Sequence, residues 1–329
     1  MGAGRELELL SVVVPLCNEE ETVRELHSRV TSALDGVPFE LVLVDDASTD
    51  LTGELLVGLA ESDARVRVIH LSRNFGHQAA LTAGLEHARG DVVAMLDGDL
   101  QDPPELIARM LEHWRSGSDV VYGVRTERKG EGRVKLATAR WFYRLFARVS
   151  DVDLSPNSGD FRLLDRRALD ALLRMRERNR FLRGMTVWIG FTQTAVPYER
   201  DARHAGETKY TARRMLRFSL DAISSFSWVP LQLATLLGFL FSAVALLAIP
   251  VVIGLRIADQ TIPGFATVLC VILLVGGIQL ITVGIIGEYV GRIYDEVKGR
   301  PLYVVREMRN FEMTQVEPPE RADDLERSP

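Results

Sequence analysis

Residues 92–104 read Val92-Val93-Ala94-Met95-Leu96-Asp97-Gly98-Asp99-Leu100-Gln101-Asp102-Pro103-Pro104. The five apolar residues at the start predict a buried strand, and the Pro-Pro pair predicts the start of a helix. Between them, the acidic turn 97–102 stands where the strand ends. Ligands bind at such strand ends in open α/β sheets, so this stretch predicts both a fold class and the position of its site.

The same alternation extends over the first two-thirds of the chain. Short runs rich in Val and Leu predict strands at residues 9–14, 41–44, 66–71, 92–96 and, more weakly, 119–122. The segments between them, residues 20–34, 51–60, 76–88 and 104–114, have helical patterns. Near-continuous apolar strands that alternate with helices predict a parallel sheet covered on both faces.

Acidic residues follow three of the predicted strands. Segment 15–20 follows the first strand, segment 45–50 (Asp-Asp-Ala-Ser-Thr-Asp) the second, and turn 97–102 the fourth. Each has a structural alternative, because its Ser or Asp side chains could cap the next helix. Three acidic ends on one rim repel one another, however, and a divalent cation is the natural compensation. Asp97 and Asp99 therefore predict a site for Mg²⁺ or Mn²⁺, held jointly with substrate phosphates.

Composition and missing motifs argue against several other classes. The 329 residues have a formal charge of −6 and only two cysteines, which excludes a disulfide scaffold and disfavours a nucleic-acid partner. The sequence contains no Gly-x-x-x-x-Gly-Lys-Ser/Thr loop, and no Gly-x-Gly-x-x-Gly follows the first strand. A P-loop NTPase and a Rossmann-type dinucleotide enzyme are thus disfavoured.

The C-terminal third is strongly apolar. Residues 222–255 and 260–287 contain no Asp, Glu, Lys or Arg. About 20 apolar residues cross a bilayer as a helix, whereas buried core helices are usually shorter and carry a polar face. The sequence therefore predicts two spans, at about 229–255 and 262–287, joined in a hairpin. Basic residues flank the hairpin on the domain side, which predicts a multi-pass inner-membrane protein with its catalytic domain and both termini in the cytoplasm.

Six motifs occur in order along the chain. They are Pro15-x-x-Asn18-Glu19, Asp45-Asp46-Ala47-Ser48-Thr49-Asp50, Arg73-Asn74-Phe75-Gly76, the stretch 97–104, Ser158-Gly159-Asp160-Phe161-Arg162 and Arg203-x-Ala205-Gly206-Glu207-Thr208-Lys209-Tyr210. With the predicted hairpin, this set resembles the polyprenyl-phosphate glycosyltransferases of glycosyltransferase family 2, which include dolichol-phosphate mannose synthases and bacterial bactoprenol (undecaprenyl-phosphate) glucosyltransferases. The resemblance covers roughly residues 9–305. It implies an α/β fold of the GT-A type (Rossmann-like, nucleotide-diphospho-sugar transferase), followed by the two-helix transmembrane hairpin.

The resemblance also implies roles for individual residues. The positions that match its donor-binding residues are Pro15, Cys17, Glu19, Asp45, Asp46 and Gly98, with Arg203 and Lys209 in a basic donor-phosphate loop. Asp97 and Asp99 match its metal-binding Asp-x-Asp, and Gln101 matches an auxiliary ligand. Leu16-Cys17 replaces the commoner Val-Tyr, so the aromatic contact to the donor base is lost and the base preference is open.

Asp160 matches the acidic residue often proposed as the catalytic base of the family. An acceptor phosphate is mostly dianionic at neutral pH, because its second pKa is about 6, and such a nucleophile does not require a strong base. Positioning and base catalysis therefore both remain open for Asp160, with a helix-cap role as a third alternative. His77, beside the same rim, is expected at the surface rather than in the chemistry.

Residues 125–148 form a basic segment, with eight Lys or Arg against two Glu. Its second half places aromatic and apolar residues among arginines, as in an amphipathic helix that lies in the lipid headgroup region, although a helix packed on the domain core is the alternative. Arg125 and Arg133 are the candidates for holding the acceptor phosphate, since a guanidinium group binds phosphate bidentately.

Together these features predict the inverting, metal-dependent transfer of one sugar from a nucleotide sugar to polyprenyl (undecaprenyl) phosphate. UDP-glucose is the leading donor, with UDP-GlcNAc and GDP-mannose as alternatives. A processive polysaccharide synthase and a non-enzymatic membrane scaffold are less favoured, because two spans make a poor polymer conduit and a scaffold does not need acidic strand ends. The predicted division is a GT-A domain at 1–218, a transmembrane and juxtamembrane part at 219–310 and a disordered tail at 311–329. The resemblance also suggests a homo-tetramer.

Overall fold

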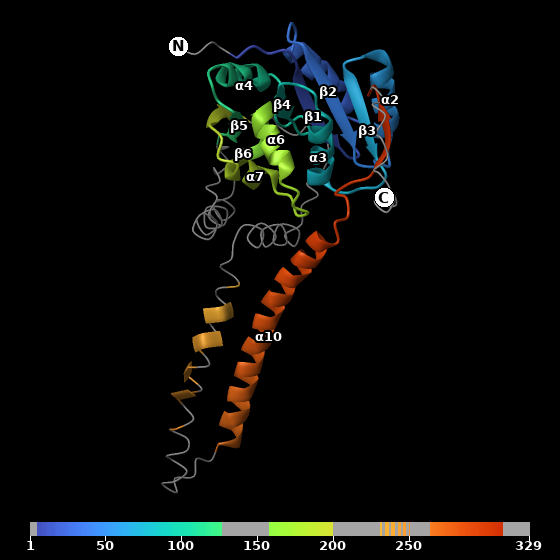
Figure 1. Ribbon diagram of the computed structural model, residues 1–329. Coiled ribbons are helices and arrows are strands. Elements are labelled where there is room, and N and C mark those ends of the chain that lie inside the picture. Colours follow the sequence, from blue (N-terminus) through green and yellow to red (C-terminus); the bar gives the residue numbers. More distant parts are fainter. Residues whose placement is uncertain are drawn as a thin grey trace, which may run out of the picture.

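The computed structural model describes residues 5–126, 158–199 and 264–311, together with residues 231, 234–236, 238–240, 243, 244, 246, 247 and 250 (Figure 1). Its main body is a layered α/β domain, from which one long helix projects (Figure 1).

One eight-stranded sheet organises the described part of the domain. Its strands are β1 (Leu10–Leu16), β2 (Phe39–Asp45), β3 (Val66–Leu71), β4 (Val92–Met95), β5 (Val120–Arg125), β6 (Ser158–Asp165), β7 (Gln193–Tyr198) and β8 (Val305–Arg309). They lie in the order β7-β5-β6-β4-β1-β2-β3-β8. The central strands β4, β1, β2 and β3 are mutually parallel, which confirms the arrangement expected from their apolar runs.

The expectation of a wholly parallel sheet is wrong, because two strands run the other way. Strand β6 is antiparallel to both β4 and β5, and β8 is antiparallel to β3. Charged residues interrupt both sequences, so neither reads as an apolar run. In β6 the buried Arg162 follows Phe161, whereas β8 is an edge strand whose Arg306 and Glu307 are exposed.

Helices cover both faces of the sheet. They are α1 (Val23–Ala33), α2 (Thr52–Ser62) and α4 (Leu106–Arg115) on one face, and α3 (His77–His87), α6 (Arg166–Arg174) and α7 (Leu182–Trp188) on the other. Successive strand residues point to opposite faces, so Val12 and Val14 pack against the first set and Val13 against the second. The domain thus has a hydrophobic core on each side of the sheet, and its strand ends are open to ligand.

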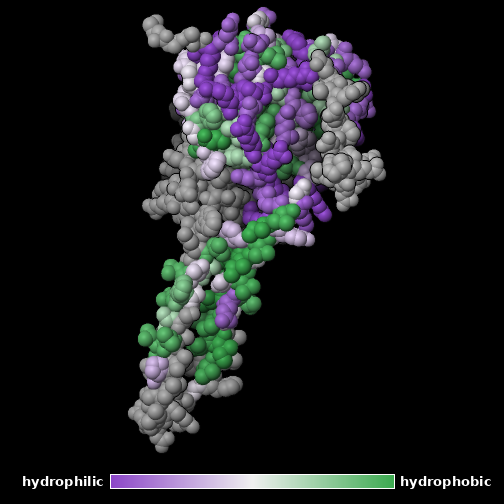
Figure 2. All heavy atoms as spheres, viewed as in Figure 1, coloured by the Kyte–Doolittle hydropathy of each residue, from purple (hydrophilic) through white to green (hydrophobic). Residues whose placement is uncertain are grey.

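The projecting helix is α10 (Phe265–Val297), which contains the one segment in the described residues that is long and apolar enough to cross a membrane, Leu274–Val297. None of that segment is buried inside the protein, and Figure 2 shows apolar side chains along the helix beneath a largely polar domain. Most of the first predicted span, 229–255, lies outside the described residues, as do the amphipathic helix of 134–149 and the tail beyond residue 311. The hairpin therefore stays a prediction.

The chain returns from α10 to the sheet. The backbone N–H of Ser72 donates to the carbonyl of Val304 at 2.9 Å, and β8 then pairs with β3. Asn310, at φ +59°, donates from its amide to the carbonyls of Ala60 at 2.6 Å and Val66 at 2.8 Å. A segment that the sequence places beside the membrane is therefore the edge strand of the catalytic sheet.

Candidate active site

A pocket of about 450 Å³ opens at the carboxyl ends of β1, β2 and β4. Its walls are Pro15, Leu16, Cys17, Glu19, Asp46, Asn74, Gly76, His77, Ala80, Asp97, Gly98, Asp99, Arg125, Asp160 and Arg183. The sequence predicts nine of these as site residues: Pro15, Cys17, Glu19, Asp46, Asp97, Gly98, Asp99, Arg125 and Asp160. The pocket lies where the strand-end rule places it.

Side-chain hydrogen bonds join the loops after β1 and β2. Asn18, at φ +56°, accepts the backbone N–H of Thr49 through Oδ1 at 2.8 Å, and its own N–H donates to Ser48 Oγ at 3.0 Å. The backbone N–H of Glu19 donates to Thr52 Oγ1 at 2.9 Å. Ser48 and Thr49 therefore connect two loops of the rim, which gives part of the acidic motif a structural role.

Asp46 connects the rim to the loop before α3. Its carboxylate accepts the backbone N–H of Phe75 at 2.7 Å and that of Gly76 at 2.9 Å. Gly76 has φ +96°, a conformation that side chains disfavour. The amide of Asn74 in the same loop donates to Cys17 Sγ at 3.2 Å, so this loop forms one wall of the pocket.

The Asp-Gly-Asp turn is fixed by close packing. A Cβ atom at Gly98 would lie 2.4 Å from Leu16 Cδ2, so any other residue between the two aspartates would require the buried Leu16 side chain to move. Leu100 has φ +56°, an unusual conformation for a bulky residue, and its side chain is fully buried. Burial of that side chain holds the turn in a strained form that aims Asp97 and Asp99 at the pocket.

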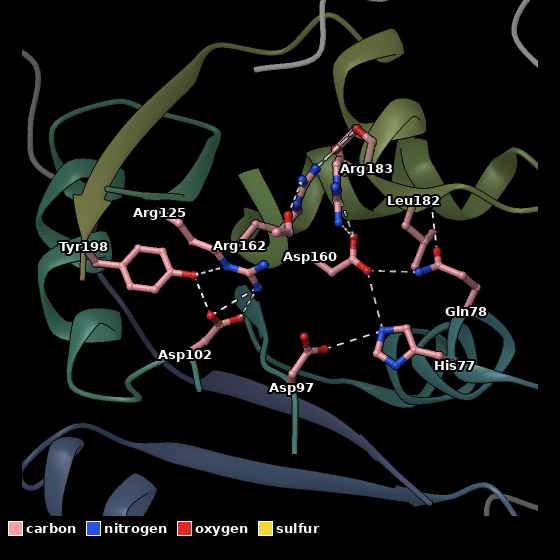
Figure 3. Close-up of polar contacts among 12 residues, drawn as sticks. His77, Gln78, Asp97, Asp102, Arg125, Asp160, Arg162, Leu182, Arg183 and Tyr198 are labelled. Atoms are coloured by element: carbon pink, nitrogen blue, oxygen red, sulfur yellow. Dashed lines mark hydrogen bonds and ion pairs between the residues drawn. The ribbon is translucent and has the colours of Figure 1, made fainter. Parts of the chain in front are cut away.

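His77 lies between two carboxylates of the pocket (Figure 3). Its Nε2 atom is 3.5 Å from Asp97 Oδ1 and 3.6 Å from Asp160 Oδ2. Burial lowers the pKa of His77, but the hydrogen bond to Asp160 and the charges of both carboxylates raise it overall to about 9. Burial raises the pKa of Asp97 to about 6, with the neighbouring Asp160 adding to that rise and His77 opposing it. The imidazolium thus partly neutralises a concentrated negative charge.

Asp160 is held from three sides. Gln78 Nε2 donates to its Oδ2 at 3.1 Å, and Arg183 donates to its Oδ1 from Nε and Nη2, both at 3.4 Å (Figure 3). Gln78 Oε1 accepts the backbone N–H of Leu182 at 3.1 Å, which ties α3 to the start of α7. Although burial raises the pKa of Asp160, the His77 hydrogen bond and the charge of Arg183 hold it well below its usual range.

Arg125 lies on the other side of Asp97 and Asp160 from His77, and contacts of its own hold it in place (Figure 3). Its Nη2 atom is 3.2 Å from Asp102 Oδ2, and its Nε donates to the hydroxyl of Tyr198 at 3.1 Å. Tyr198 in turn donates to Asp102 Oδ1 at 2.5 Å. A Cβ atom at Gly159 would lie 2.8 Å from Arg125 Nη2, so the glycine before Asp160 makes room for the guanidinium group.

Some predicted residues are not in the pocket wall. Asp45 is buried beneath the rim, where its Oδ2 is 3.0 Å from His70 Nδ1 and its Oδ1 accepts the backbone N–H of Ser48 at 2.9 Å. Gln101 is also buried and does not line the pocket, although its backbone N–H donates to Asp99 Oδ1 at 3.2 Å. Arg133, Arg203 and Lys209 lie outside the described residues.

The donor set fits a divalent cation that is shared with a substrate. Asp97 and Asp99 offer carboxylate oxygens to the pocket. Burial and neighbouring carboxylates disfavour the ionised form of Asp97, and a bound cation would compensate its charge. Within residues 5–126, 158–199 and the described part of the C-terminal region, no three His, Cys, Asp or Glu side chains form a metal site by themselves. Substrate oxygens would have to supply further ligands, as is usual for Mg²⁺ bound with phosphates.

Sequence reasoning missed the residues that position Asp160. His77 and Gln78 begin α3 directly after the Arg73–Gly76 motif, and this position was the available signal. His77 is partly exposed, as expected, yet it faces the pocket. Arg183 is on a short helix that lacks any motif, so nothing in the sequence indicated that it contacts Asp160.

Comparisons with known proteins agree with this geometry. Residues 11–173 match the family described as Glycosyl transferase family 2. A protein of Bacillus subtilis (strain 168), the uncharacterized glycosyltransferase YkcC, is 47% identical over 305 residues, which are 92% of this chain and 94% of that protein. The chain belongs to glycosyltransferase family 2. The mixed sheet with its parallel centre is accordingly the GT-A fold expected from the sequence, and the chain is a nucleotide-sugar glycosyltransferase.

Other relatives of this family 2 glycosyltransferase have more specific names. The SfII prophage-derived bactoprenol glucosyl transferase of Shigella flexneri is 38% identical over 300 residues, covering 90% of this chain and 97% of that protein. The prophage bactoprenol glucosyl transferase homolog of Escherichia coli (strain K12) is 38% identical over 303 residues, covering 91% and 99%. The similarity therefore extends beyond the catalytic domain and includes α10 of the glycosyltransferase.

Proposed function

We propose that this glycosyltransferase transfers one sugar, with UDP-glucose as the best donor, to the phosphate of a polyprenyl lipid such as undecaprenyl phosphate. The observation that carries the proposal is a pocket with both carboxylates and guanidinium groups, in a chain similar over nine-tenths of its length to bactoprenol glucosyl transferases. UDP-GlcNAc and GDP-mannose are the alternative donors.

The pocket provides separate groups for the two substrates: carboxylates that would hold a cation for the donor diphosphate, and a guanidinium group for the acceptor phosphate. Cys17, Glu19 and Asp46 at the ends of β1 and β2 would contact the nucleoside of the donor. Asp97 and Asp99 would hold a Mg²⁺ or Mn²⁺ ion, which supplies electrostatic stabilisation of the departing diphosphate. Arg125, at the opposite wall, would hold the phosphate of the acceptor lipid, as would Arg133.

The reaction needs correct placement more than it needs a strong base. An oxygen of the acceptor phosphate attacks the anomeric carbon as the bond to the nucleoside diphosphate breaks, and attack from the opposite side inverts the configuration. Asp160 has a pKa well below its usual range, so it is a weak proton acceptor. The contacts with His77, Gln78 and Arg183 instead suit a carboxylate that positions groups around the reacting atoms.

The proposed setting is the cytoplasmic face of the inner membrane. Helix α10 is apolar and unburied over Leu274–Val297, and the basic residues near the domain favour the cytoplasm for the domain and both termini. The two-span hairpin, the interfacial helix and the homo-tetramer belong to this proposal, as does the disordered tail after residue 310.

A donor panel tests the proposed reaction. Full-length protein in detergent is incubated with undecaprenyl phosphate and labelled UDP-glucose, UDP-GlcNAc or GDP-mannose, with Mg²⁺, Mn²⁺ or EDTA. We expect lipid-extractable label from UDP-glucose, abolished by EDTA, because the diphosphate charge then lacks compensation. Label transferred from another donor would identify that donor in place of UDP-glucose. The absence of label with all three donors would overturn the proposal.

Two charge-matched variants make this test specific. Asp97→Asn removes one carboxylate from the pocket and is expected to reduce transfer at least about 100-fold. Asp170→Asn removes one exposed carboxylate from α6, whose contact is a 3.8 Å ion pair with Arg166, and is expected to retain normal transfer. Equal activity of the two variants would contradict the assigned role of Asp97.

A further inference from the structure

A second and larger hollow, of about 980 Å³, lies where α10 meets the catalytic domain. It is bounded by the end of α3, the segment between α6 and α7, and residues 295–305. Four arginines line it: Arg176, Arg178, Arg180 and Arg300. Its size is within the range of ligand-binding cavities, and it is separate from the pocket that contains Asp97 and Asp160.

None of these four arginines forms an ion pair with a carboxylate in the part of the chain that the structure describes. Arg178 Nη1 donates to the carbonyl of Arg300 at 3.2 Å, and Arg180 Nη2 donates to the carbonyl of Met175 at 2.6 Å. Arg180 is only 9% exposed, and its Nε has no hydrogen-bond partner. Burial disfavours the charged form of Arg180, while Glu86 and Glu177 attract its charge without forming an ion pair with it. A guanidinium group this deeply buried without a contacting carboxylate is costly, so an anion in the hollow would be stabilising.

The three carboxylates in the wall are already engaged with other donors. Glu296 Oε1 accepts the backbone N–H of Arg178 at 2.7 Å, Glu86 accepts the hydroxyl of Tyr303, and Asp295 lies 3.8 Å from Lys298 Nζ. The guanidinium groups therefore retain unused hydrogen-bonding capacity, and guanidinium binds phosphate oxygens bidentately.

The position of the hollow identifies the source of the phosphate. The candidate membrane span Leu274–Val297 of α10, whose last ten residues include four charged ones, ends beside Gly299 and Arg300 in its wall. We propose that the hollow binds the phosphate of an anionic membrane glycerophospholipid, which clamps α10 to the catalytic domain. This proposal rests on the membrane location proposed above, but on neither the donor sugar nor the transfer reaction.

Thermal unfolding of the full-length protein in detergent tests the site. The midpoint of thermal unfolding is measured in the absence of any sugar donor. Short-chain phosphatidylglycerol, short-chain phosphatidylcholine and inorganic phosphate are each added in turn, at equal concentrations. We expect phosphatidylglycerol to raise the midpoint and the other two to have little effect, because a ligand that binds only the folded state stabilises it. A full shift from inorganic phosphate, or an equal shift from phosphatidylcholine, would overturn the assignment to an anionic lipid.

Two double variants locate the binding. R176Q/R300Q removes two exposed guanidinium groups from the hollow, and R109Q/R115Q removes two exposed ones from α4. We expect the first to weaken phosphatidylglycerol binding about tenfold or more, from the loss of charged hydrogen bonds, and the second to leave it unchanged. Equal binding by both would exclude the hollow. Sugar transfer, measured separately on the same preparations, distinguishes failure of this site from failure of the proposed reaction.

Discussion

At the scale of single residues, Asp160 is held in place by hydrogen bonds from Gln78 and Arg183. The sequence predicts its membership of the site, because it follows Ser158-Gly159 in a recognisable motif. It leaves open whether this residue is a base, since that depends on contacts from α3 and α7, which are distant in the chain. Gln78 and Arg183 supply those contacts and are 82 and 23 residues from Asp160. Such contacts are consequences of packing and leave no local pattern.

Replacement of Asp160 separates positioning from base catalysis. We expect Asp160→Asn to retain measurable turnover, with a loss below about 100-fold, because removal of an essential base costs about 10²–10⁴-fold. Its activity should be nearly constant above about pH 7, where the acceptor phosphate is already dianionic. The measurement is kcat as a function of pH, together with a titration that gives the affinity of the variant for the donor. Complete loss with normal donor binding would instead identify Asp160 as an essential base.

Asp45 is expected to stabilise the fold rather than bind substrate. Burial raises its pKa, but hydrogen bonds from His70 and Ser48 lower it below its ordinary value. A carboxyl group whose pKa is lower in the folded state stabilises that state above its unfolded pKa of about 3.9, and the effect is lost as the pH falls. Asp45→Asn should therefore be less stable than the parent by about 1–3 kcal/mol near neutral pH.

The pH dependence of that difference is the decisive measurement. Denaturant unfolding of both proteins should show a difference that is constant above about pH 5 and shrinks as the pH falls below the unfolded pKa of about 3.9. The reason is that Asp45 of the parent is then protonated in the unfolded chain before it is protonated in the folded one. A difference that does not change over this interval would mean that the charge of Asp45 contributes nothing.

At the scale of elements, the apolar runs predict β1 to β4 and, more weakly, β5, but they fail for β6, β7 and β8. Strands β1 to β4 have near-continuous apolar runs because every residue in each of them is buried. Strand β6 places the buried Arg162 between buried apolar residues, and this charge is tolerated because Nη2 donates to the carbonyl of Gly159 at 3.0 Å. A hydrogen bond of this kind cannot be read from hydropathy.

Strand β8 depends on the residue that follows it. Asn310→Ala removes the hydrogen bonds to the carbonyls of Ala60 and Val66 and places alanine at φ +59°. We expect the free energy of unfolding to fall by about 2 kcal/mol or more, from lost hydrogen bonds and the unfavourable left-handed conformation. Arg306→Ala, an exposed change on the same strand, is the control. Denaturant unfolding that gives the same stability for both variants would contradict this role of Asn310.

At the scale of the whole molecule, composition predicts an apolar C-terminal part but not how it joins the domain. The charge-free run 260–287 indicates a long helix, and α10 confirms one there. The return of the chain to β3 could not be predicted, because three of the five residues of β8 are charged and its partner lies more than 230 residues earlier in the sequence. A GT-A domain predicted to end near residue 218 in fact includes a strand beyond α10.

The pairing of β8 with β3 determines the order in which the protein can be completed during translation. The ribosome makes β8 after every pocket residue and after the whole of α10, so the β3 edge stays open for about 10–50 s at 5–20 residues per second. An open edge of this kind invites mispairing with other chains. A nascent chain released before residue 305 would contain all the described catalytic groups but an unfinished sheet. The described catalytic sheet can therefore be completed only after the apolar helix α10 has been synthesised.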